Sequence, residues 1–390
     1  MKRKICVVTD SRAEYGIMYW LIHELNADTD IELQIVTLGA HASPEFGNTH
    51  QDIIADGFEV TRNLETTISG DSPNAICHSM SIAMTSFSHA LLELKPDMIV
   101  LLGDRYEMMA VAQVAFTHCV PIAHLHGGET TEGAIDEAFR HSITKMSTLH
   151  FTSTDNHKRR VMQLGENPAN VYNFGAPAID HIYRQKLMSR EELSESIGFD
   201  LSGPIAMITY HPVTLETESS EEQVDNLLDA MTQSKLRAVF TGVNADTSGR
   251  IINKKIKEFC EQNGDRFHFV TNLGQHRYHS SLKHFDLMIG NSSSGIIESG
   301  SFQLPVVNIG PRQRGRDRGP NVIDCDYGLA DISKSIDRAL SSEFQKSIAD
   351  SQNVYAGPEP GRASILMKDV LKSFKLDSKT LMKKFFDVTE

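Results

Sequence analysis

Short apolar runs alternate with amphipathic segments along most of this chain, and this alternation restricts the fold more than any other feature. The run DMIVLLGD, at 97–104, is apolar at nearly every position before its polar end, which is typical of a strand covered on both faces. The next segment, 106–118, has apolar residues every three to four positions, the period of a helix. Strands separated by helices predict a parallel sheet with helices on both sides. Further strands are expected at 4–10, 31–39 and 120–126, and further helices at 15–26 and 73–95.

The same pattern starts again in the second half of the chain, after an expected loop at about 175–200. Because 390 residues are more than one compact domain usually holds, we expect an α/β protein with two doubly wound, parallel-sheet domains. The first is expected at 1–175 and the second at 176–364, with a C-terminal helix at about 365–390 able to pack back on the first. Strands of the second domain are expected at 203–212, 236–242, 266–272, 286–295 and 304–310.

Composition and charge argue against several classes of protein. The formal net charge of −13 disfavours general binding to nucleic acid, which normally requires a basic face. The five cysteines are scattered and include no C-x-x-C pair, which disfavours a disulfide framework and a cysteine zinc site. The apolar run at 98–102 is far short of the ~20 residues of a membrane helix, and the run before Asp10 is too short for a signal peptide. We therefore expect a cytoplasmic protein that binds neither nucleic acid nor membranes.

Polar side chains follow the ends of several expected strands. In open α/β sheets, ligands bind beyond the carboxyl ends of the strands. We therefore expect the polar residues at these ends to line a ligand cleft between the two domains. They lie at 10–12, 103–105, 124, 126, 211 and 291–294.

The segment HLHGGETTEGAIDEAFRH, at 124–141, carries the densest group of titratable residues. Helical spacing from about Ile135 would pair Asp136 with Arg140 and Glu137 with His141, as on any solvated helix. That interpretation leaves the preceding His-Leu-His-Gly-Gly-Glu unexplained. A metal site is the obvious alternative, but His-x-His with one Glu is only a moderate metal pattern, and no H-E-x-x-H accompanies it. We expect no metal here.

Two further segments are typical of anion sites. In TDSRAEYG (9–16), Arg12 lies beside an expected helix N-terminus, although Ser11 could simply cap the helix and leave Arg12 in solvent. In GNSSSGIIE (290–298), serine hydroxyls and backbone N–H groups precede a helix, and Glu298, one to two turns into it, suits paired sugar hydroxyls.

Asp104 could be exposed at the sheet edge, cap the next helix, or do both. Neither G-x-G-x-x-G nor the Walker motif is present near these strand ends.

Several of these segments together resemble one family. SRAEYG, GDRYE, HGGE…DEAFRHSITK, HPVT, NADT and GNSSSGIIE…GPRQRGR occur in the order and approximate spacing of the UDP-N-acetylglucosamine 2-epimerases. They are most similar to the hydrolysing branch, which makes N-acetylmannosamine for sialic-acid synthesis. The resemblance covers about residues 4–325. It implies a GT-B-like fold of two Rossmann-like domains with the nucleotide sugar between them, no metal or redox cofactor, and a homo-oligomer, either a dimer or a tetramer.

The resemblance also implies a reaction and a set of residues. In the family, UDP is eliminated across C1–C2 to give a 2-acetamidoglucal, and water then adds at C1 while a proton returns to C2. Many relatives have Glu where this chain has His126, so we expect both His126 and Glu129 to be needed. The expected catalytic residues are Asp104, His126, Glu129, Asp136 and His211. The expected substrate-binding residues are Arg12, His41, Arg105, His124, Glu137, Asn244, Ser292, Ser293, Glu298 and Arg312.

The identity of the sugar stays open at this point. The His-x-His variant favours UDP-N-acetylglucosamine. Related hydrolysing enzymes of legionaminic-acid synthesis instead use a UDP-2,4-diacetamido-2,4,6-trideoxy sugar. The resemblance also leaves room for a non-hydrolysing epimerase, a GT-B glycosyltransferase or a non-catalytic sugar-nucleotide sensor. The intact set of acid–base residues argues against the last two.

Overall fold

The computed structural model describes residues 2–70, 72–131, 135–211, 220–242, 247–377 and 380–388. The chain forms two compact units, Met1–Tyr183 with Ala356–Glu390, and Arg184–Tyr355. The chain therefore leaves the first unit after Tyr183 rather than at the predicted 175, and returns to it at Ala356 rather than after 364. Asp180 gives a reason for the difference. Its buried carboxylate accepts hydrogen bonds from the Ala363 and Ser364 N–H groups at 3.1 and 2.8 Å, which ties both crossing segments to the first unit.

The first unit contains a seven-stranded sheet in the order β3-β2-β1-β4-β5-β6-β7. All neighbouring strands in it are parallel. The strand order reverses between β1 and β4, which makes their carboxyl ends the expected ligand position of this unit. The strands are β1 Arg3–Thr9, β2 Ile31–Thr37, β3 Arg62–Asn63, β4 Met98–Leu102, β5 Ile122–Leu125, β6 Leu149–Thr152 and β7 Val171–Asn173.

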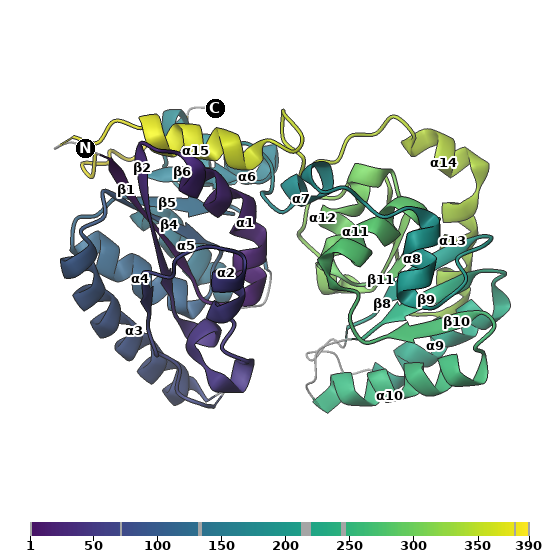
Figure 1. The fold of residues 1–390 in the computed structure, drawn as a ribbon. Helices are drawn as coiled ribbons and strands as arrows, with labels where there is room; N and C mark the ends of the chain where they lie inside the picture. Colours follow the sequence, from purple (N-terminus) through teal and green to yellow (C-terminus); the bar gives the residue numbers. More distant parts are fainter. Residues whose placement is uncertain are drawn as a thin grey trace. The chain divides into compact units, whose positions relative to one another are not determined.

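Helices cover both faces of this sheet (Figure 1). Along β1, Ile5 and Val7 pack into one apolar cluster and Cys6 and Val8 into another, as the alternation of side chains along a strand requires. The helices are α1 Arg12–Ala27, α2 His50–Ala55, α3 Pro73–Leu94, α4 Tyr106–Thr117, α5 Asp136–Met146, α6 Asp155–Gln163, α7 Ile179–Arg184 and α15 Ala363–Ser373.

Helix α15 comes from the far end of the sequence and packs on the first unit. Its buried residues Met367 and Leu371 lie in the same cluster as Met18 and Leu21 of α1. In Figure 1, α15 is the yellow helix beside α1. A C-terminal helix does return to the first unit, but it ends at Ser373 rather than continuing towards residue 390.

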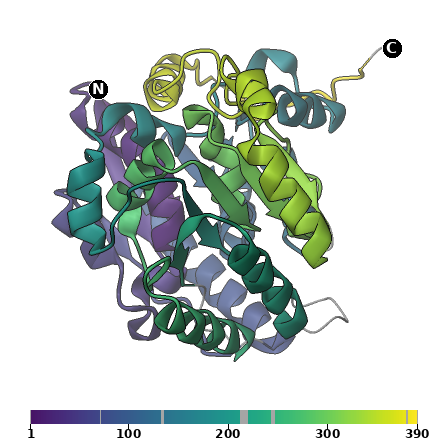
Figure 2. The same ribbon diagram turned by 90° about the vertical axis from the view of Figure 1, so that its right-hand side faces the viewer.

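The second unit repeats the strand order of the first. Its six parallel strands have the order β10-β9-β8-β11-β12-β13, so the reversal lies between β8 and β11. The strands are β8 Ile205–Thr209, β9 Arg237–Thr241, β10 Phe267–Val270, β11 Leu287–Gly290, β12 Val306–Ile309 and β13 Val322–Cys325. The helices, which flank the sheet in Figure 2, are α8 Arg190–Ile197, α9 Ser220–Gln233, α10 Thr247–Gln262, α11 Gly274–His284, α12 Ser293–Ile297, α13 Leu329–Leu340 and α14 Ser342–Ile348.

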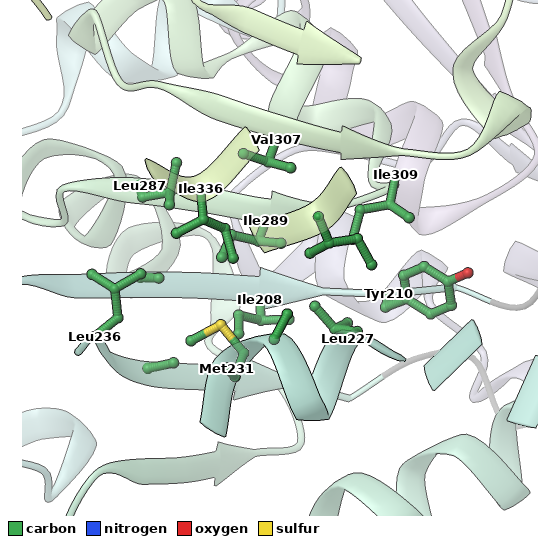
Figure 3. Close-up of a cluster of buried hydrophobic side chains, with 14 of the residues drawn as sticks. Ile208, Tyr210, Leu227, Met231, Leu236, Leu287, Ile289, Val307, Ile309 and Ile336 are labelled. Carbon is green, nitrogen blue, oxygen red and sulfur yellow. The ribbon is translucent and has the colours of Figure 1, made fainter. Parts of the chain in front are cut away.

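Figure 3 shows the larger core of this unit. Ile208 and Tyr210 at the end of β8 face helix residues Leu227 and Met231, while Met207 points to the opposite face. Tyr210 is fully buried, and its hydroxyl donates to Gln223 Oε1 at 2.8 Å. The core therefore fixes the end of β8 from which the polar residues of the second unit begin.

The predicted α/β architecture with two parallel sheets is confirmed, but some elements differ. Helices α7 and α8 lie within the stretch 175–200 that was predicted to be a loop, and the strand predicted at 286–295 ends at Gly290 and gives way to α12. Short 3-10 helices lie at Gly39–Ala42, Pro44–Phe46, Pro168–Asn170, Ser299–Phe302 and Pro311–Gln313. None of the helices in the described ranges is both long enough and apolar enough to span a membrane.

Candidate active site

Acidic residues surround one guanidinium at the point in the first unit where the strand order reverses. Arg105, directly after β4 and Asp104, places its Nε 2.8 Å from Oδ2 of Asp10, which follows β1 and is fully buried. Arg105 also contacts Glu107, and the buried Glu14 accepts from the Asp10 N–H at 3.2 Å. Burial raises the pKa of Asp10 to about 6 against the opposing effect of Arg105. Arg105 was expected to bind substrate. Its guanidinium contacts these carboxylates and is about half exposed, and substrate binding by Arg105 stays a prediction.

Arg140 connects the strand ends to helix α5. Its guanidinium is almost completely buried and contacts the Asp104 carboxylate. It also donates to Glu137 Oε2 at 2.9 Å, to the Glu129 carbonyl oxygen at 2.9 Å and to Thr131 Oγ1 at 2.8 Å. A single side chain therefore holds together residues from the end of β4, the loop after β5, and α5.

The contacts of Arg140 differ from those expected on a solvated helix. Arg140 contacts Asp104 and Glu137, whereas the helical spacing had suggested Asp136. The second expected pair is present, with 3.2 Å between His141 Nε2 and Glu137 Oε1. Asp104 does not cap α4, because Arg105 occupies the N-cap position without a side-chain hydrogen bond. Arg140 was missing from the predicted site, although its place in DEAFRH of the family motif could have indicated it.

Asp136 begins α5 and is partly buried. Burial raises the pKa of its carboxyl, which Arg105 opposes. A carboxyl with a raised pKa holds its proton nearer to neutral pH, which suits a group that donates and accepts protons.

The loop after β5 explains the two glycines of His-Leu-His-Gly-Gly-Glu. A Cβ on Gly128, at φ +80°, would lie 2.3 Å from the carbonyl oxygen of His157, and one on Gly127 would lie 3.0 Å from Thr144 Oγ1. Only glycine therefore lets this loop pack so closely against the helices beside it. The loop returns Glu129 to His126, with 2.8 Å between Glu129 Oε1 and His126 Nδ1.

His124 and His41 lie inside the first unit and have no exposed surface. His124 Nε2 donates to the Gly103 carbonyl oxygen at 2.8 Å, and its Nδ1 lies 3.1 Å from Thr144 Oγ1. Burial lowers the pKa of His124 to about 3 and that of His41 to about 4, so both rings are neutral. The sequence predicted that both bind substrate. In this structure His124 supports the backbone at Gly103 and the His41 ring contacts the hydroxyls of Thr9 and Thr49, and substrate binding by these two residues stays a prediction.

At the start of α1, the sequence left open whether Ser11 only caps the helix or Arg12 also forms an anion site. Ser11 caps the helix, since its Oγ accepts from the Glu14 N–H at 3.4 Å. Arg12 is the first helical residue and is largely exposed, with 3.5 Å between its Nε and Oδ2 of Asp52. It is therefore available to an anionic ligand at the helix N-terminus.

In the second unit, Asn291 and His211 meet where the strand order reverses. Asn291 is fully buried after β11, accepts from the His211 N–H at 2.7 Å and donates to the His211 carbonyl at 2.8 Å. Its own carbonyl oxygen accepts from Arg312 Nη1 at 3.0 Å and from Gln313 Nε2 at 2.8 Å. Asn291 therefore fixes both His211, at the end of β8, and the half-buried Arg312, in the turn after β12.

The serines that follow Asn291 form a short hydroxyl network. Ser292 Oγ lies 3.0 Å from Ser294 Oγ, which in turn contacts the hydroxyl of Tyr278. Ser293 begins α12, but this helix has only five residues, so Glu298 lies at its C-terminal end and not one to two turns inside it. His279, almost fully buried, places Nε2 3.3 Å from Glu298 Oε1.

The structure therefore brings the predicted residues together in two groups, one in each unit. Asp104, His126, Glu129, Asp136 and Glu137 belong to the first group, and His211, Ser292, Ser293, Glu298 and Arg312 to the second. Asn244 lies outside the described residues. Among the residues that the structure does describe, no three or more His, Cys, Asp or Glu side chains gather as metal ligands would.

Comparisons with known proteins agree on one family. The model of the family described as UDP-N-acetylglucosamine 2-epimerase matches residues 23–372. A hydrolysing GDP/UDP-N,N'-diacetylbacillosamine 2-epimerase of Campylobacter jejuni is 40% identical, over 99% of this chain and 100% of that protein. The polysialic acid biosynthesis protein P7 of Escherichia coli is 37% identical, over 100% of this chain and 98% of that protein. A hydrolysing UDP-N,N'-diacetylbacillosamine 2-epimerase of Legionella pneumophila is 34% identical, over 98% of this chain and 99% of that protein.

Solved structures confirm the fold class. A UDP-N-acetylglucosamine 2-epimerase from Neisseria meningitidis, bound to UDP-N-acetylglucosamine, has a TM-score of 0.79 at 17% identity, over 94% of this chain and 99% of that one. A related structure from Listeria monocytogenes has a TM-score of 0.76 at 18% identity, over 96% of both chains. The expected GT-B-like class, with two Rossmann-like units, is therefore confirmed.

Proposed function

The chain belongs to the UDP-N-acetylglucosamine 2-epimerase family, and from this membership we propose that it is a hydrolysing 2-epimerase that releases UDP and a free 2-epimerised sugar. It is an enzyme that acts on a nucleotide sugar. The observation that carries the proposal is the similarity, over nearly the whole chain, to relatives named as hydrolysing 2-epimerases. The non-catalytic sensor considered from the sequence has no such support.

The preferred substrate in this proposal is UDP-N,N'-diacetylbacillosamine, a UDP-2,4-diacetamido-2,4,6-trideoxyglucose. The relative at 34% identity is named for this nucleotide sugar, and the relative at 40% identity is named for the same sugar linked to GDP or UDP. This ranking reverses the preference that the His-x-His variant suggested. UDP-N-acetylglucosamine is the second candidate, because the relative at 37% identity is named for polysialic acid biosynthesis.

Elimination of UDP requires a group that takes the proton at C2 of the sugar, and product formation requires a group that returns one. We assign these transfers to residues of the first group, namely Asp104, His126 and Asp136. The electron pair of the C2–H bond forms the C1=C2 double bond, and the pair of the breaking C1–O bond goes to the phosphate oxygen of UDP. Water then adds at C1. His211 in the second unit remains a further catalytic candidate.

The leaving UDP gains negative charge as the C1–O bond breaks, so donors aimed at its phosphates accelerate the step. We propose that Arg12, Arg312 and the Ser292 and Ser293 hydroxyls contribute these donors. Glu298, which His279 holds, is proposed to accept from the ribose hydroxyls. The predicted homo-oligomer and cytoplasmic location stay predictions.

Initial rates of UDP release from the two candidate sugars would test the substrate. They differ at C4, where an acetamido group replaces a hydroxyl, and at C6, where a methyl replaces a hydroxymethyl group. A site built for one should favour it in kcat/KM by at least about tenfold. We expect the diacetamido sugar to be favoured. A tenfold preference for UDP-N-acetylglucosamine would reverse the assignment, and release of UDP from neither sugar would contradict the proposed function.

A further inference from the structure

His126 has a backbone conformation that side-chain-bearing residues rarely adopt. Its φ is +64°, in the left-handed region, where a residue with a Cβ is strained. The backbone is nevertheless well anchored, because the His126 N–H donates to the Phe151 carbonyl of β6 at 2.9 Å. Strain of this kind persists only where the surroundings impose it, and it is concentrated at functional sites. The turn orients the imidazole of His126 towards Glu129.

Glu129 lies behind His126 and is almost completely buried. Its Oε1 is 2.8 Å from His126 Nδ1 and also accepts from the Ser153 hydroxyl at 2.7 Å. Ser153 Oγ is in turn 2.9 Å from His157 Nδ1, and both residues are buried. The Arg140 guanidinium holds the carbonyl of Glu129 at 2.9 Å. The carboxylate is therefore fixed from behind and directed at the imidazole.

This arrangement determines which nitrogen of His126 carries the proton. An ionised carboxylate can only accept hydrogen bonds, so Nδ1 must donate to Glu129. In the neutral ring, Nε2 then has a free lone pair. Nε2 is buried and has no hydrogen-bond partner among the described residues, so no described contact competes for that lone pair.

We propose that His126 Nε2 carries out one of the two proton transfers at C2 of the sugar, and that Glu129 is a positioning residue that acts through His126. The proposal rests on the proposed function. It assigns separate roles to His126 and Glu129, which the sequence predicted only to be needed together. In the elimination direction, Nε2 takes the C2 proton, the C2–H electrons form the C1=C2 bond, and the C1–O electrons leave with UDP. The imidazolium that forms is stabilised by the Glu129 carboxylate. If His126 serves the return step instead, its Nε2–H delivers a proton to C2 and the ring becomes neutral. The other transfer then belongs to another group, because inversion at C2 requires proton removal and return on opposite faces of the sugar.

Glu129→Gln is the sharpest test, because it preserves the shape of the side chain. The amide N–H₂ of Gln would donate to Nδ1 and stabilise the Nε2–H tautomer, which removes the lone pair from the reacting side. We expect kcat to fall by about 10²–10⁴-fold, a range that includes the loss seen when the analogous carboxylate of a serine protease is amidated. KM and the Kd for UDP should change less than about threefold, because in this proposal Glu129 acts only through His126.

The ring nitrogens of His126 can be observed directly in protein labelled with ¹⁵N-histidine. The proposal requires the Nδ1–H tautomer in the wild type and the Nε2–H tautomer in Glu129→Gln. Glu129→Asp keeps a carboxylate, so it should keep the Nδ1–H tautomer and lose less kcat than Glu129→Gln. Glu59→Gln, at an exposed glutamate, is the matched control and should match the wild type in both measurements.

Each outcome decides a separate point. An Nε2–H tautomer in the wild type would overturn the proposal even if Glu129→Gln did not fold. An unchanged tautomer together with wild-type kcat in Glu129→Gln would overturn the positioning role of Glu129. The tautomer measurement needs no turnover, so a wild type inactive on both nucleotide sugars would contradict the proposed function and still leave the His126–Glu129 arrangement under test.

Discussion

At the scale of single residues, Arg140 shows how few contacts hold the acid–base group together. It pairs with Asp104 and Glu137 and also holds two positions of the loop after β5. A buried guanidinium with four acceptors cannot be replaced by an ammonium, because lysine lacks the planar fork. The geometry therefore predicts a strong effect from a substitution that conserves charge.

We predict that Arg140→Lys lowers the free energy of unfolding by about 1–3 kcal/mol, since at least one buried acceptor loses its donor. It should also lower kcat, because Asp104 and the loop lose their common anchor. Urea denaturation and initial rates measure both effects. Arg62→Lys is the control, because Arg62 forms an exposed ion pair with Glu93 and should change stability by less than about 0.5 kcal/mol. Wild-type stability in Arg140→Lys would contradict this role.

Asp136 is the first residue of α5 and is only partly buried. A substitution there should therefore disturb the packing of the protein little, so it tests the chemistry of the site. Asp136→Asn removes a titratable group whose pKa burial raises. Turnover should fall at least about 100-fold, as for loss of a general acid or base, while UDP binding by calorimetry stays unchanged. Asp350→Asn, at an exposed site, should have no effect. Wild-type turnover of Asp136→Asn would remove this residue from the mechanism.

At the scale of elements, the loop after β5 is built around close backbone approaches. A Cβ at Gly128 would meet the His157 carbonyl at 2.3 Å, and its φ of +80° disfavours any residue with a side chain. Gly128→Ala should therefore lower the free energy of unfolding by about 2 kcal/mol or more and displace Glu129 from His126.

The matched control for this loop is Gly16→Ala. Gly16 lies in α1, and a Cβ there would meet nothing within 4 Å. Alanine in place of a glycine inside a helix raises stability by up to about 1 kcal/mol. Thermal denaturation of the two variants should thus shift Tm in opposite directions. A Gly128→Ala protein as stable as the wild type would mean that the loop can move away from α6.

The C-terminal segment forms another element contact, at Glu166. This almost fully buried carboxylate lies 2.6 Å from Lys145 of α5, 2.6 Å from Lys383 and 3.0 Å from His150 of β6. Burial raises its pKa, but the hydrogen bonds from these three residues outweigh burial and bring it to about 2. Lys383, near the end of the chain, is thereby attached to the helix that carries Arg140.

A carboxyl whose pKa is lower in the folded protein than in the unfolded chain stabilises the folded state when it is ionised. Glu166 contributes stability above its ordinary pKa of 4.5, and this is lost as pH falls from there towards about 2. Glu166→Gln should therefore cost about 2–3 kcal/mol at pH 7, and the difference from the wild type should shrink below pH 4. Urea denaturation across this range measures the difference. Glu93→Gln, in an exposed pair, should show no such pH dependence, and a pH-independent deficit in Glu166→Gln would refute this assignment.

The strands that were predicted and those that were missed differ in a physical way. Runs such as β4, buried on both faces, are apolar throughout and easily found. β6 reads Leu-His-Phe-Thr and has a fully buried histidine whose partner, Glu166, is distant in sequence, so its polarity concealed it. β3 and β7 have only two and three residues, too few for a clear alternation, and the four residues of β13 include the exposed Asp324.

At the scale of the whole molecule, the two units repeat one strand order, and each brings two strand ends together at its reversal. In the first unit Asp10 meets Arg105, and in the second His211 meets Asn291. Position after a strand predicted which residues would lie there, because parallel strands share a carboxyl edge. It could not predict what each contacts. His124 turned inward, and Arg140 became the central cation, because those outcomes depend on packing across elements.

The central claim, hydrolytic epimerisation through exchange at C2, is tested most directly by a proton NMR time course in deuterated water. The protein would be incubated with UDP-N,N'-diacetylbacillosamine, and in parallel with UDP-N-acetylglucosamine. We predict free UDP and a free 2-epimerised sugar that carries deuterium at C2. A 2-epimer still attached to UDP, or a free sugar that keeps its original configuration and its C2 proton, would contradict the account.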